Sequence, residues 1–265
     1  MNANRSPSPI PHTPPPEPVW KTTARDWTAV LVRQIIVSGA KLLTGVRAFW
    51  GSGARVSGPS AEQTVYFANH TSHGDFVLLW ATLPNDLRTL TRPVAGEDYW
   101  DRSRVRRFIG RDVFNALMIR RDAQAAGLDP LAQMRAALTA GDSLILFPEG
   151  TRNMGDEVLL PLKSGIYHLH QSFAPVRFVP VWIENLKRVL PKGALLPVPL
   201  ACTVRFGEPL AWVDQEEKAV FLARARQALL DLRPEHDREG MLHAVSMPPP
   251  PPPAATLAPQ PGEGA

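Results

Sequence analysis

The sequence has few of the features that hold small secreted proteins together. Its 265 residues include a single cysteine, Cys202, which cannot form an internal disulfide and whose apolar neighbours predict a core thiol in a strand. The first twenty residues contain no apolar stretch, so no secretory signal is expected. No apolar run reaches the ~20 residues that a membrane-spanning helix needs. Disulfide scaffolds, export and membrane spans are therefore not expected.

Neither sign of charge dominates, because 29 Lys and Arg against 25 Asp and Glu give a net charge of +4. This mild excess fits acidic ligands or anionic lipid without requiring either. An arginine-rich stretch at residues 102–121 lacks the readout elements of nucleic-acid binding, so no nucleic-acid partner is expected. A solvated face, part of it against anionic lipid headgroups, fits this stretch better. The length and the 44% hydrophobic content suit one large domain.

Proline-rich segments flank the chain at both ends. Residues 1–19 and 246–265 are too rich in proline and small polar residues to form a core, so both are expected to be disordered tails. From Trp27 to Trp50 apolar residues recur at helical spacing, which predicts an amphipathic helix within residues 20–54. Such a helix suits a lipid interface and, equally, a place on its own domain. Residues 55–245 would form that domain.

The centre of the chain alternates strand-like and helix-like segments. This order predicts an α/β fold with a largely parallel central sheet flanked by helices. The expected strands are residues 64–68, 143–147, 178–183 and 201–206, and the expected helices are residues 76–83, 128–139 (ending at Gly141) and 215–232. The loops that follow parallel strands would meet at one edge of the sheet, where ligands bind.

The first strand runs into a dense polar cluster, Asn-His-Thr-Ser-His-Gly-Asp at residues 69–75. Ser72 and Asp75 have the spacing of a capping pair, with Ser72 as N-cap and Asp75 at N3 of the next helix. The Asp75 carboxylate would then point back at His70, fix its tautomer and leave the other ring nitrogen free to accept a proton. Taken singly, His70 could be an ordinary loop histidine and Asp75 an ordinary capping residue.

Two other interpretations of this cluster are weaker. A metal site built from His70, His73 and Asp75 would lack a further ligand cluster at a recognised spacing, so no metal is expected. A serine hydrolase would need a Gly-x-Ser-x-Gly elbow around Ser72, and the sequence has none there. His168 and His170 are two residues apart, so on a helix they would face different ways, and they are expected to be surface or packing residues.

A second cluster, Phe-Pro-Glu-Gly-Thr-Arg at residues 147–152, follows the strand at 143–147. The glycine permits a tight turn, Thr151 offers a hydroxyl, and Arg152 can bind a phosphate through two hydrogen bonds. A solvated turn with a surface arginine is the equal alternative when the segment is taken alone. If the strands before the two clusters are parallel, both loops open into one cleft.

Together the two clusters resemble the signature of the glycerolipid acyltransferase family, which includes 1-acylglycerol-3-phosphate acyltransferases. That family carries a histidine, four residues and an aspartate, matched by His70 and Asp75, and later a Phe-Pro-Glu-Gly-Thr-Arg block that is matched in full. A looser block that ends in arginine is similar to the segment from Gly110, with Arg121 as the preferred equivalent and Arg120 as the alternative.

The resemblance implies an acyltransferase that moves a fatty acyl group from acyl-CoA or acyl-carrier protein to the hydroxyl of 1-acylglycerol 3-phosphate. The product would be phosphatidic acid for phospholipid biosynthesis, and no cofactor is needed. His70 would be the base, Asp75 would orient it, and the substrate-binding residues would be Arg121, Glu149, Gly150, Thr151, Arg152 and Lys163.

The resemblance also implies a peripheral enzyme on the cytoplasmic face of a membrane, with the helix at residues 20–54 as its docking element. Three alternative functions agree with part of this interpretation. One is an enzyme of the same superfamily with another lysolipid acceptor, one is a thioesterase in which water attacks the donor, and one is a lipid-binding protein without catalysis.

Overall fold

A computed structural model describes most of the chain between residues 24 and 234. The described residues are 24–52, 62–120, 129–173, 176–184 and 201–234, with only the backbone described for 24–26. Both predicted tails lie outside them. The strands are β1 (Arg47–Trp50), β2 (Thr64–Ala68), β3 (Thr91–Gly96), β4 (Leu117–Ile119), β5 (Ser143–Leu146), β6 (Arg177–Glu184) and β7 (Thr203–Phe206).

These strands form a seven-stranded sheet in the order β1-β7-β6-β2-β5-β3-β4. Every neighbouring pair is parallel except β6 and β7, which run antiparallel. The predicted α/β fold with a largely parallel sheet is therefore confirmed. The predicted central strands and helices lie within three residues of their expected bounds, because alternating apolar runs and turn signals mark them well.

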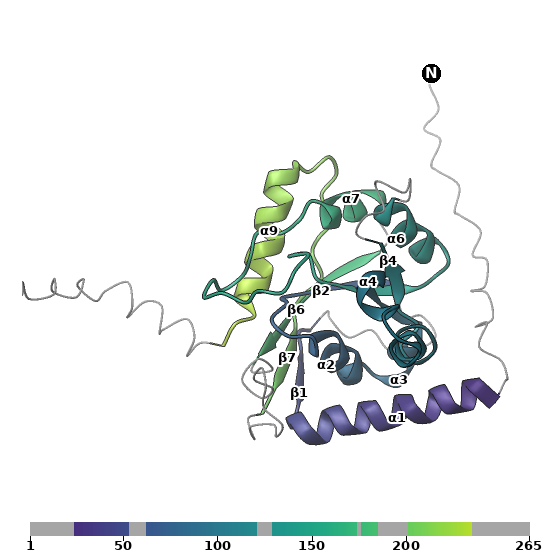
Figure 1. Cartoon of the computed structure of the whole chain (residues 1–265). Coiled ribbons are helices and arrows are strands. Elements are labelled where there is room, and N and C mark those ends of the chain that lie inside the picture. Colours follow the sequence, from purple (N-terminus) through teal and green to yellow (C-terminus); the bar gives the residue numbers. More distant parts are fainter. Residues whose placement is uncertain (1–23, 53–61, 121–128, 174–175, 185–200, 235–265) are drawn as a thin grey trace, which may run out of the picture. The chain divides into compact units, whose positions relative to one another are not determined.

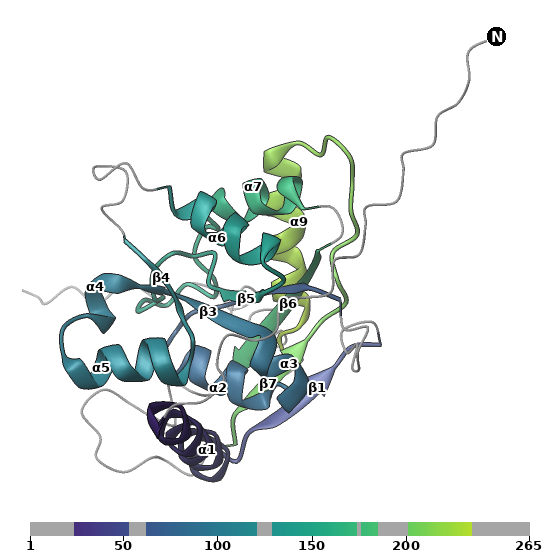
Figure 2. The ribbon, with the colours of Figure 1, turned by 90° about the vertical axis from the view of Figure 1, so that its right-hand side faces the viewer.

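Helices cover both faces of this sheet (Figure 1). The helices are α1 (Ala24–Thr44), α2 (Asp75–Thr82), α3 (Asn85–Leu90), α4 (Glu97–Trp100), α5 (Arg104–Phe108), the π-helix η1 (Ile109–Val113), α6 (Pro130–Thr139), α7 (Gly165–Ser172) and α9 (Lys218–Asp231). On one face lie α1, α2 and α3, and on the other lie α6, α7 and α9, with the sheet between them (Figure 2).

Strand β2 shows why both faces need a cover. Its five residues are all buried, and alternate side chains point to opposite faces. Val65 and Phe67 join the apolar cluster under α6, α7 and α9, whereas Tyr66 and Ala68 join the cluster under α1 and α2. A strand that is apolar on both faces is typical of a parallel sheet between two helical layers.

The prediction of a helix that continues to Trp50 is wrong. Helix α1 ends at Thr44, Gly45 follows with a positive φ of 53°, and the Arg47 N–H donates to the Cys202 carbonyl at 3.0 Å to open β1. The Trp50 ring then stacks on Phe206 at 3.7 Å. Local periodicity cannot show this pairing, because β7 is distant in the sequence.

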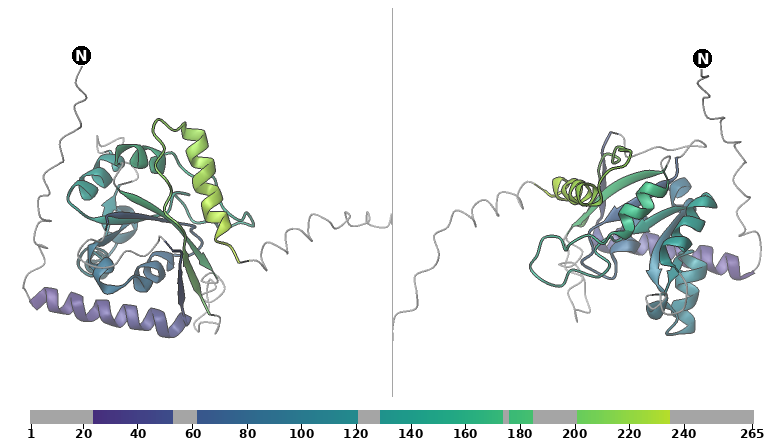
Figure 3. Two further views of the ribbon diagram at one scale, coloured as in Figure 1. Left: turned by 180° about the vertical axis from the view of Figure 1, so that it is seen from behind. Right: turned by 90° about the horizontal axis from the view of Figure 1, so that it is seen from above.

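Helix α1 presents different residues to the domain and to the solvent than its pattern predicts. Val37 is buried on the domain side, and Arg33, predicted on the polar side, donates its Nε–H to the Val113 carbonyl at 2.9 Å. Leu31 and Ile35 are 62% exposed and Leu42 is 85% exposed. Figure 3 shows α1 along the edge of the helical layer beside α2 and α3. None of the described helices is long and apolar enough to cross a membrane.

Burial strongly shifts the pKa values of three titratable side chains in the described core, Tyr66, His170 and Cys202. Cys202 is fully buried, which raises the pKa of its thiol to about 11 and confirms it as a core thiol. His170 of α7 packs among Phe178, Trp212 and Phe221, with ring centroids at 4.6–4.8 Å. Burial, with a smaller contribution from the Arg224 charge, lowers the pKa of His170 to about 4, although the Glu216 charge opposes the shift. His170 is therefore a neutral packing residue, as predicted.

His170 predicts a loss of stability in mild acid. The unfolded chain binds this proton near pH 6.5 and the folded chain only near pH 4, so the free energy of unfolding falls as the pH drops between these values. At pH 5 the loss amounts to about 2 kcal/mol. Denaturant unfolding at pH 7.5 and pH 5 measures this change. Between these pH values the free energy of unfolding should fall by about 2 kcal/mol less in His170→Phe than in wild type.

The matched control for this prediction is His168→Phe, because His168 lies on the same helix but is exposed. It should keep the pH dependence of the wild type. An identical acid loss in wild type and His170→Phe would contradict the assignment of His170 as a buried neutral base.

Candidate active site

The two polar clusters lie together because the strands that precede them are neighbours. β2 and β5 pair in parallel, with Phe67 opposite Leu146, so residues 69–75 and 147–152 leave the sheet at the same edge. A cleft of about 830 Å³ opens there, and both segments line it. The predicted shared cleft at the carboxyl ends of the strands is thus confirmed.

His70 and Asp75 form the predicted contact. The His70 Nδ1 and the Asp75 Oδ2 are 2.9 Å apart, and the same oxygen accepts hydrogen bonds from the N–H groups of Thr71 (2.6 Å) and Ser72 (2.8 Å). Asp75 is fully buried, whereas His70 lines the cleft and stacks on Phe147. An ionised carboxylate accepts the Nδ1 proton, so the Nε2 of His70 is the nitrogen left for a substrate.

The capping pair predicted for Ser72 and Asp75 is wrong. Helix α2 begins at Asp75 itself, its N-cap is Gly74, and no side chain caps it. Asp75 therefore occupies N1 rather than N3. Its carboxylate still points back along the chain, because three donors upstream of the helix bind Oδ2. Ser72 Oγ accepts only a long hydrogen bond, 3.3 Å, from the Gly74 N–H.

Glu149 lies behind the histidine rather than in the cleft. Its side chain is 1% exposed, Oε1 accepts the His70 N–H at 2.7 Å, and Oε2 accepts the Leu160 N–H at 2.9 Å. Burial raises the pKa of Glu149, and these two backbone donors oppose the shift by stabilising the charged form. The prediction that Glu149 binds substrate does not fit this position, because the carboxylate is occupied by the backbone of two loops and does not line the cleft.

Two asparagines complete the support of His70, and the sequence did not reveal their roles. The Asn153 N–H donates to the His70 carbonyl at 2.7 Å, so Glu149 and Asn153 hold the His70 backbone through its N–H and its carbonyl. Asn69 exchanges two hydrogen bonds with the Ile183 backbone on β6, at 2.7 and 3.0 Å. The signals for Asn69 were its place directly after a buried strand and its position before His70 in the first cluster.

Most of the other predicted substrate residues line the cleft. Gly150, Thr151, Arg152 and Lys163 do so, and Gly150 has a positive φ of 71°, which explains a glycine at that turn. Of the two alternative arginines, Arg120 lines the cleft, with its Nε 4.0 Å from the Glu97 Oε2. Arg121, the preferred alternative, lies outside the described residues.

The lining of the cleft has an apolar part and a charged part. Its apolar side chains come mainly from β5, α6 and α7 and include Leu146, Met134, Ile166 and Leu169, and its cations are Arg102, Arg120, Arg152 and Lys163. His73, Phe76, Tyr99 and Trp100 add an aromatic wall. A concave site with an apolar interior and a few convergent polar groups suits an anionic amphiphile.

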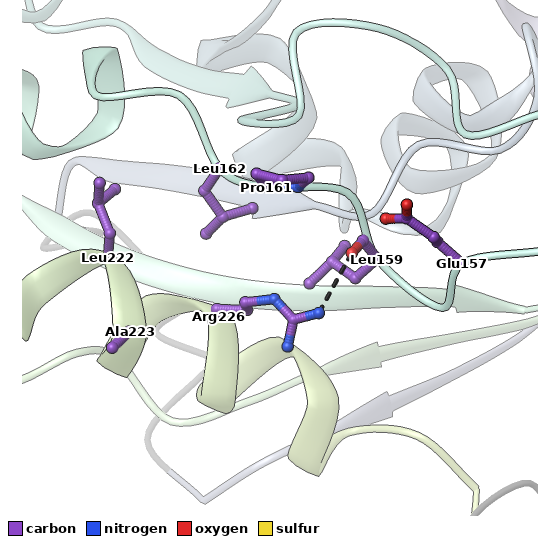
Figure 4. A pocket seen from close by; sticks show the side chains of 7 residues that line it. All are labelled: Glu157, Leu159, Pro161, Leu162, Leu222, Ala223 and Arg226. Atoms are coloured by element: carbon purple, nitrogen blue, oxygen red, sulfur yellow. Dashed lines mark hydrogen bonds between the residues drawn. The ribbon is translucent and has the colours of Figure 1, made fainter. Parts of the chain in front are cut away.

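A second hollow of about 300 Å³ lies between α9 and residues 157–162. Figure 4 shows Leu162 and Leu222 on opposite sides of it, with the Arg226 guanidinium bonded to the Leu159 carbonyl at 3.2 Å. Its lining contains no histidine, serine or cysteine, so its one carboxylate, Glu157, has no neutral nucleophile or histidine beside it. The larger cleft is therefore the candidate active site.

Known proteins share both the sequence pattern and the fold. Residues 54–184 match the model of a family described as Acyltransferase. The chain is 27% identical over 206 residues to a 1-acyl-sn-glycerol-3-phosphate acyltransferase of Cocos nucifera, covering 73% of this chain and 61% of that protein. It is 28% identical over 157 residues to a protein of the same name from Limnanthes alba, covering 56% and 50%. The chain thus spans between half and three fifths of these relatives.

The fold matches a solved structure over a larger share of both chains. The crystal structure of the 1-acyl-sn-glycerophosphate (LPA) acyltransferase PlsC from Thermotoga maritima covers 86% of each chain with a TM-score of 0.58 at 17% identity. The chain therefore has the acyltransferase fold. Its α/β sheet places the His–Asp pair and the Phe-Pro-Glu-Gly-Thr-Arg turn in the loops after two adjacent parallel strands. Within this class, the family match and the names of the relatives support the glycerolipid acyltransferase family for residues 54–184.

The position of Glu149 predicts a kinetic signature for Glu149→Gln. The amide keeps one acceptor oxygen but turns an NH₂ group toward one of the two backbone donors, leaving a buried N–H unpaired at a cost of about 1–3 kcal/mol. The resulting displacement of His70 should lower kcat about 10- to 100-fold with little change in KM for the acceptor. Steady-state kinetics with a glycerolipid acceptor measure both parameters.

Glu157→Gln is the matched control, because Glu157 is an exposed glutamate of the same loop, away from the cleft. It should behave as wild type. A raised KM with an unchanged kcat in Glu149→Gln would instead mean that Glu149 contacts the substrate.

Proposed function

We propose that this protein transfers a fatty acyl group from a thioester donor to the hydroxyl of 1-acylglycerol 3-phosphate, giving phosphatidic acid. The observation that carries the proposal is the 2.9 Å contact between His70 and Asp75 at the wall of the cleft. It engages Nδ1 and leaves Nε2 for an acceptor hydroxyl. The names of the relatives from Cocos and Limnanthes support the same reaction.

In the proposed reaction His70 Nε2 takes the proton of the acceptor hydroxyl as its oxygen attacks the thioester carbonyl. The tetrahedral intermediate then collapses, the carbon–sulfur bond breaks, and the thiolate leaves and takes up the proton held by His70. Asp75 stabilises the imidazolium between these steps and keeps the ring in one orientation. A positioned base of this kind contributes about 10²–10⁴-fold to the rate.

The cationic part of the cleft would hold the acceptor phosphate. Arg152 offers a planar fork for two phosphate oxygens, and Thr151 and Lys163 add a hydroxyl and a point charge on the same side of the cleft. Arg120 lines the cleft as well and fits this role. Arg121, which the family resemblance prefers, stays a candidate for the same role.

The apolar part of the cleft would hold acyl chain. Met134, Ile166 and Leu169 lie between α6 and α7, beside the end of β5 that leads into the second cluster. Acyl-CoA and acyl-carrier protein both present the required thioester, and both remain possible donors. A thioesterase or another lysolipid acceptor would use the same base, so the assay must score free fatty acid and several acceptors.

The proposed reaction predicts that His70→Ala abolishes turnover. Purified protein in detergent with labelled acyl-CoA and 1-acylglycerol 3-phosphate should form phosphatidic acid, and the substitution should lower the rate at least about 100-fold. His168→Ala, an exposed histidine outside the cleft, is the matched control. Wild type that forms only free fatty acid would indicate a thioesterase, and activity that survives His70→Ala would overturn the mechanism.

We also propose that α1 holds the protein on the cytoplasmic face of a membrane. The helix packs on the domain through its Val37 side, while Leu31, Ile35 and Leu42 leave a second apolar stripe exposed. Exposed large apolar side chains on one helix face suit the headgroup boundary of a bilayer. The exposed cations of α5, Arg104 and Arg107, would add attraction to anionic lipid.

The exposed stripe predicts membrane binding that a double substitution weakens. In vesicle sedimentation, Leu31→Asp with Ile35→Asp should lose binding by at least about tenfold per residue, since each side chain gives up about 1.5–3 kcal/mol of apolar burial. Val220→Asp, an exposed apolar position on α9 across the sheet, is the control. Equal loss in all variants would refute a specific docking face.

A further inference from the structure

His73 is the residue of the first cluster to which the proposed reaction gives no role. It lies three residues after His70, it lines the same cleft, and its side chain is exposed. Its ring stacks on Tyr99 of α4 at 5.3 Å with an interplanar angle of 19°. Tyr99 in turn is covered by the Arg106 guanidinium at 4.8 Å.

These contacts hold the imidazole in place without using its nitrogens. Stacking is a contact of ring faces, so the ring edge with Nδ1 and Nε2 remains available to a ligand in the cleft. No hydrogen bond to His73 is among those of the described residues. The side chain is thus oriented in advance, which lowers the entropy lost when it binds a ligand.

The charges that face His73 are predominantly positive. Partial burial, the Arg152 charge of the second cluster, His70 and the Arg106 charge of α5 all lower the pKa of His73, and only Asp75 raises it. A neutral imidazole near the Arg152 and Arg106 charges avoids the repulsion that a third cation would suffer. An anion placed beside it would remove that repulsion and favour the charged, hydrogen-donating form.

The covalent structure of the acceptor limits how far its phosphate can lie from His70. Four covalent bonds separate the attacking hydroxyl oxygen of a 1-acylglycerol 3-phosphate from its phosphorus, a distance on the order of 5 Å. The residues that bind the phosphate therefore have to be close neighbours of His70. His73 and Arg152 both meet this condition, because His73 shares a loop with His70 and Arg152 directly precedes Asn153, whose N–H donates to the His70 carbonyl at 2.7 Å.

We propose that His73 and Arg152 bind the phosphate monoester of the acceptor between them, and that His73 thereby selects acceptors that carry a phosphate monoester. This inference rests on the proposed function and adds a phosphate ligand that the shared family motif does not supply, since the motif fixes only His70 and Asp75 in this segment. A bulky headgroup esterified to the phosphate would replace the oxygen that His73 binds.

The test uses His73→Phe, which keeps a ring to stack on Tyr99 and removes both nitrogens. Equilibrium binding of sn-glycerol 3-phosphate to the full chain in detergent should weaken about tenfold, the loss expected for one charge-assisted hydrogen bond. His168→Phe makes the same change at an exposed position outside the cleft and should bind as wild type. Unchanged binding in His73→Phe would reduce His73 to a packing residue and overturn the proposal.

Kinetics supply the second measurement. His73→Phe should raise KM for 1-acylglycerol 3-phosphate and leave kcat unchanged. The rise in KM should be smaller for a lysophospholipid with an esterified headgroup. In a double-mutant cycle with Arg152→Met, the two losses in binding should be less than additive, because each removes part of one phosphate site. A fall in kcat at constant KM, or fully additive losses, would contradict a shared phosphate site.

The binding and turnover assays separate the two proposals. Binding of glycerol 3-phosphate needs neither donor nor turnover, so a His73-dependent phosphate site in a protein that makes no phosphatidic acid would overturn the proposed function alone. Normal synthesis of phosphatidic acid by wild type, with unchanged binding and KM in His73→Phe, would overturn the role of His73 alone.

Discussion

The hydrogen bond from the His70 N–H to the buried Glu149 carboxylate is the contact on which the geometry of the site depends. It joins the loop after β2 to the loop after β5, and the other Glu149 oxygen extends the link to the Leu160 backbone. A charged acceptor makes such a bond stronger than one between neutral groups. Because Glu149 and Asn153 bind both sides of the His70 peptide, the ring can rotate only about its side-chain bonds, and Asp75 and Phe147 restrict that rotation.

The sequence was sufficient to predict the fold class and the shared cleft of the two clusters. It was insufficient to predict which residues of the clusters face the cleft and which bind the backbone behind it. Parallel strands place their following loops at one edge, so neighbouring strands bring His70 and Arg152 to one cleft. Whether a carboxylate faces the cleft or the backbone behind it depends on packing between distant segments. Glu149 was therefore predicted as a substrate ligand, although it is buried against residue 160. The start of α2 was misplaced for a related reason, since the Asp75 carboxylate binds upstream N–H groups more strongly than Ser72 caps the helix.

Helix α1 shows a further limit of pattern analysis. An amphipathic pattern predicts one apolar face, but this helix has two: a buried side around Val37 and an exposed side with Leu31, Ile35 and Leu42. On the buried side Arg33 also lies against the domain, where the Val113 carbonyl accepts its hydrogen bond and the Trp80 ring lies 5.9 Å from its guanidinium carbon. Packing on the domain and contact with lipid are thus not alternatives, because each uses a different side of the helix.

The arrangement of the cleft matches the amphiphilic acceptor of the proposed reaction. A lysolipid joins an apolar chain to a charged headgroup through a short glycerol unit, and its reactive hydroxyl lies between the two. In the cleft, Leu146 and Met134 belong to the apolar part, Arg152 and Lys163 belong to the charged part, and His70 lines the same cleft on the loop beside the charged cluster. In the proposed reaction, a base held rigidly at that boundary would meet the hydroxyl once the two ends of the substrate are bound. Selectivity among acceptors then has to come from the side chains that contact the headgroup, since the base treats every hydroxyl alike.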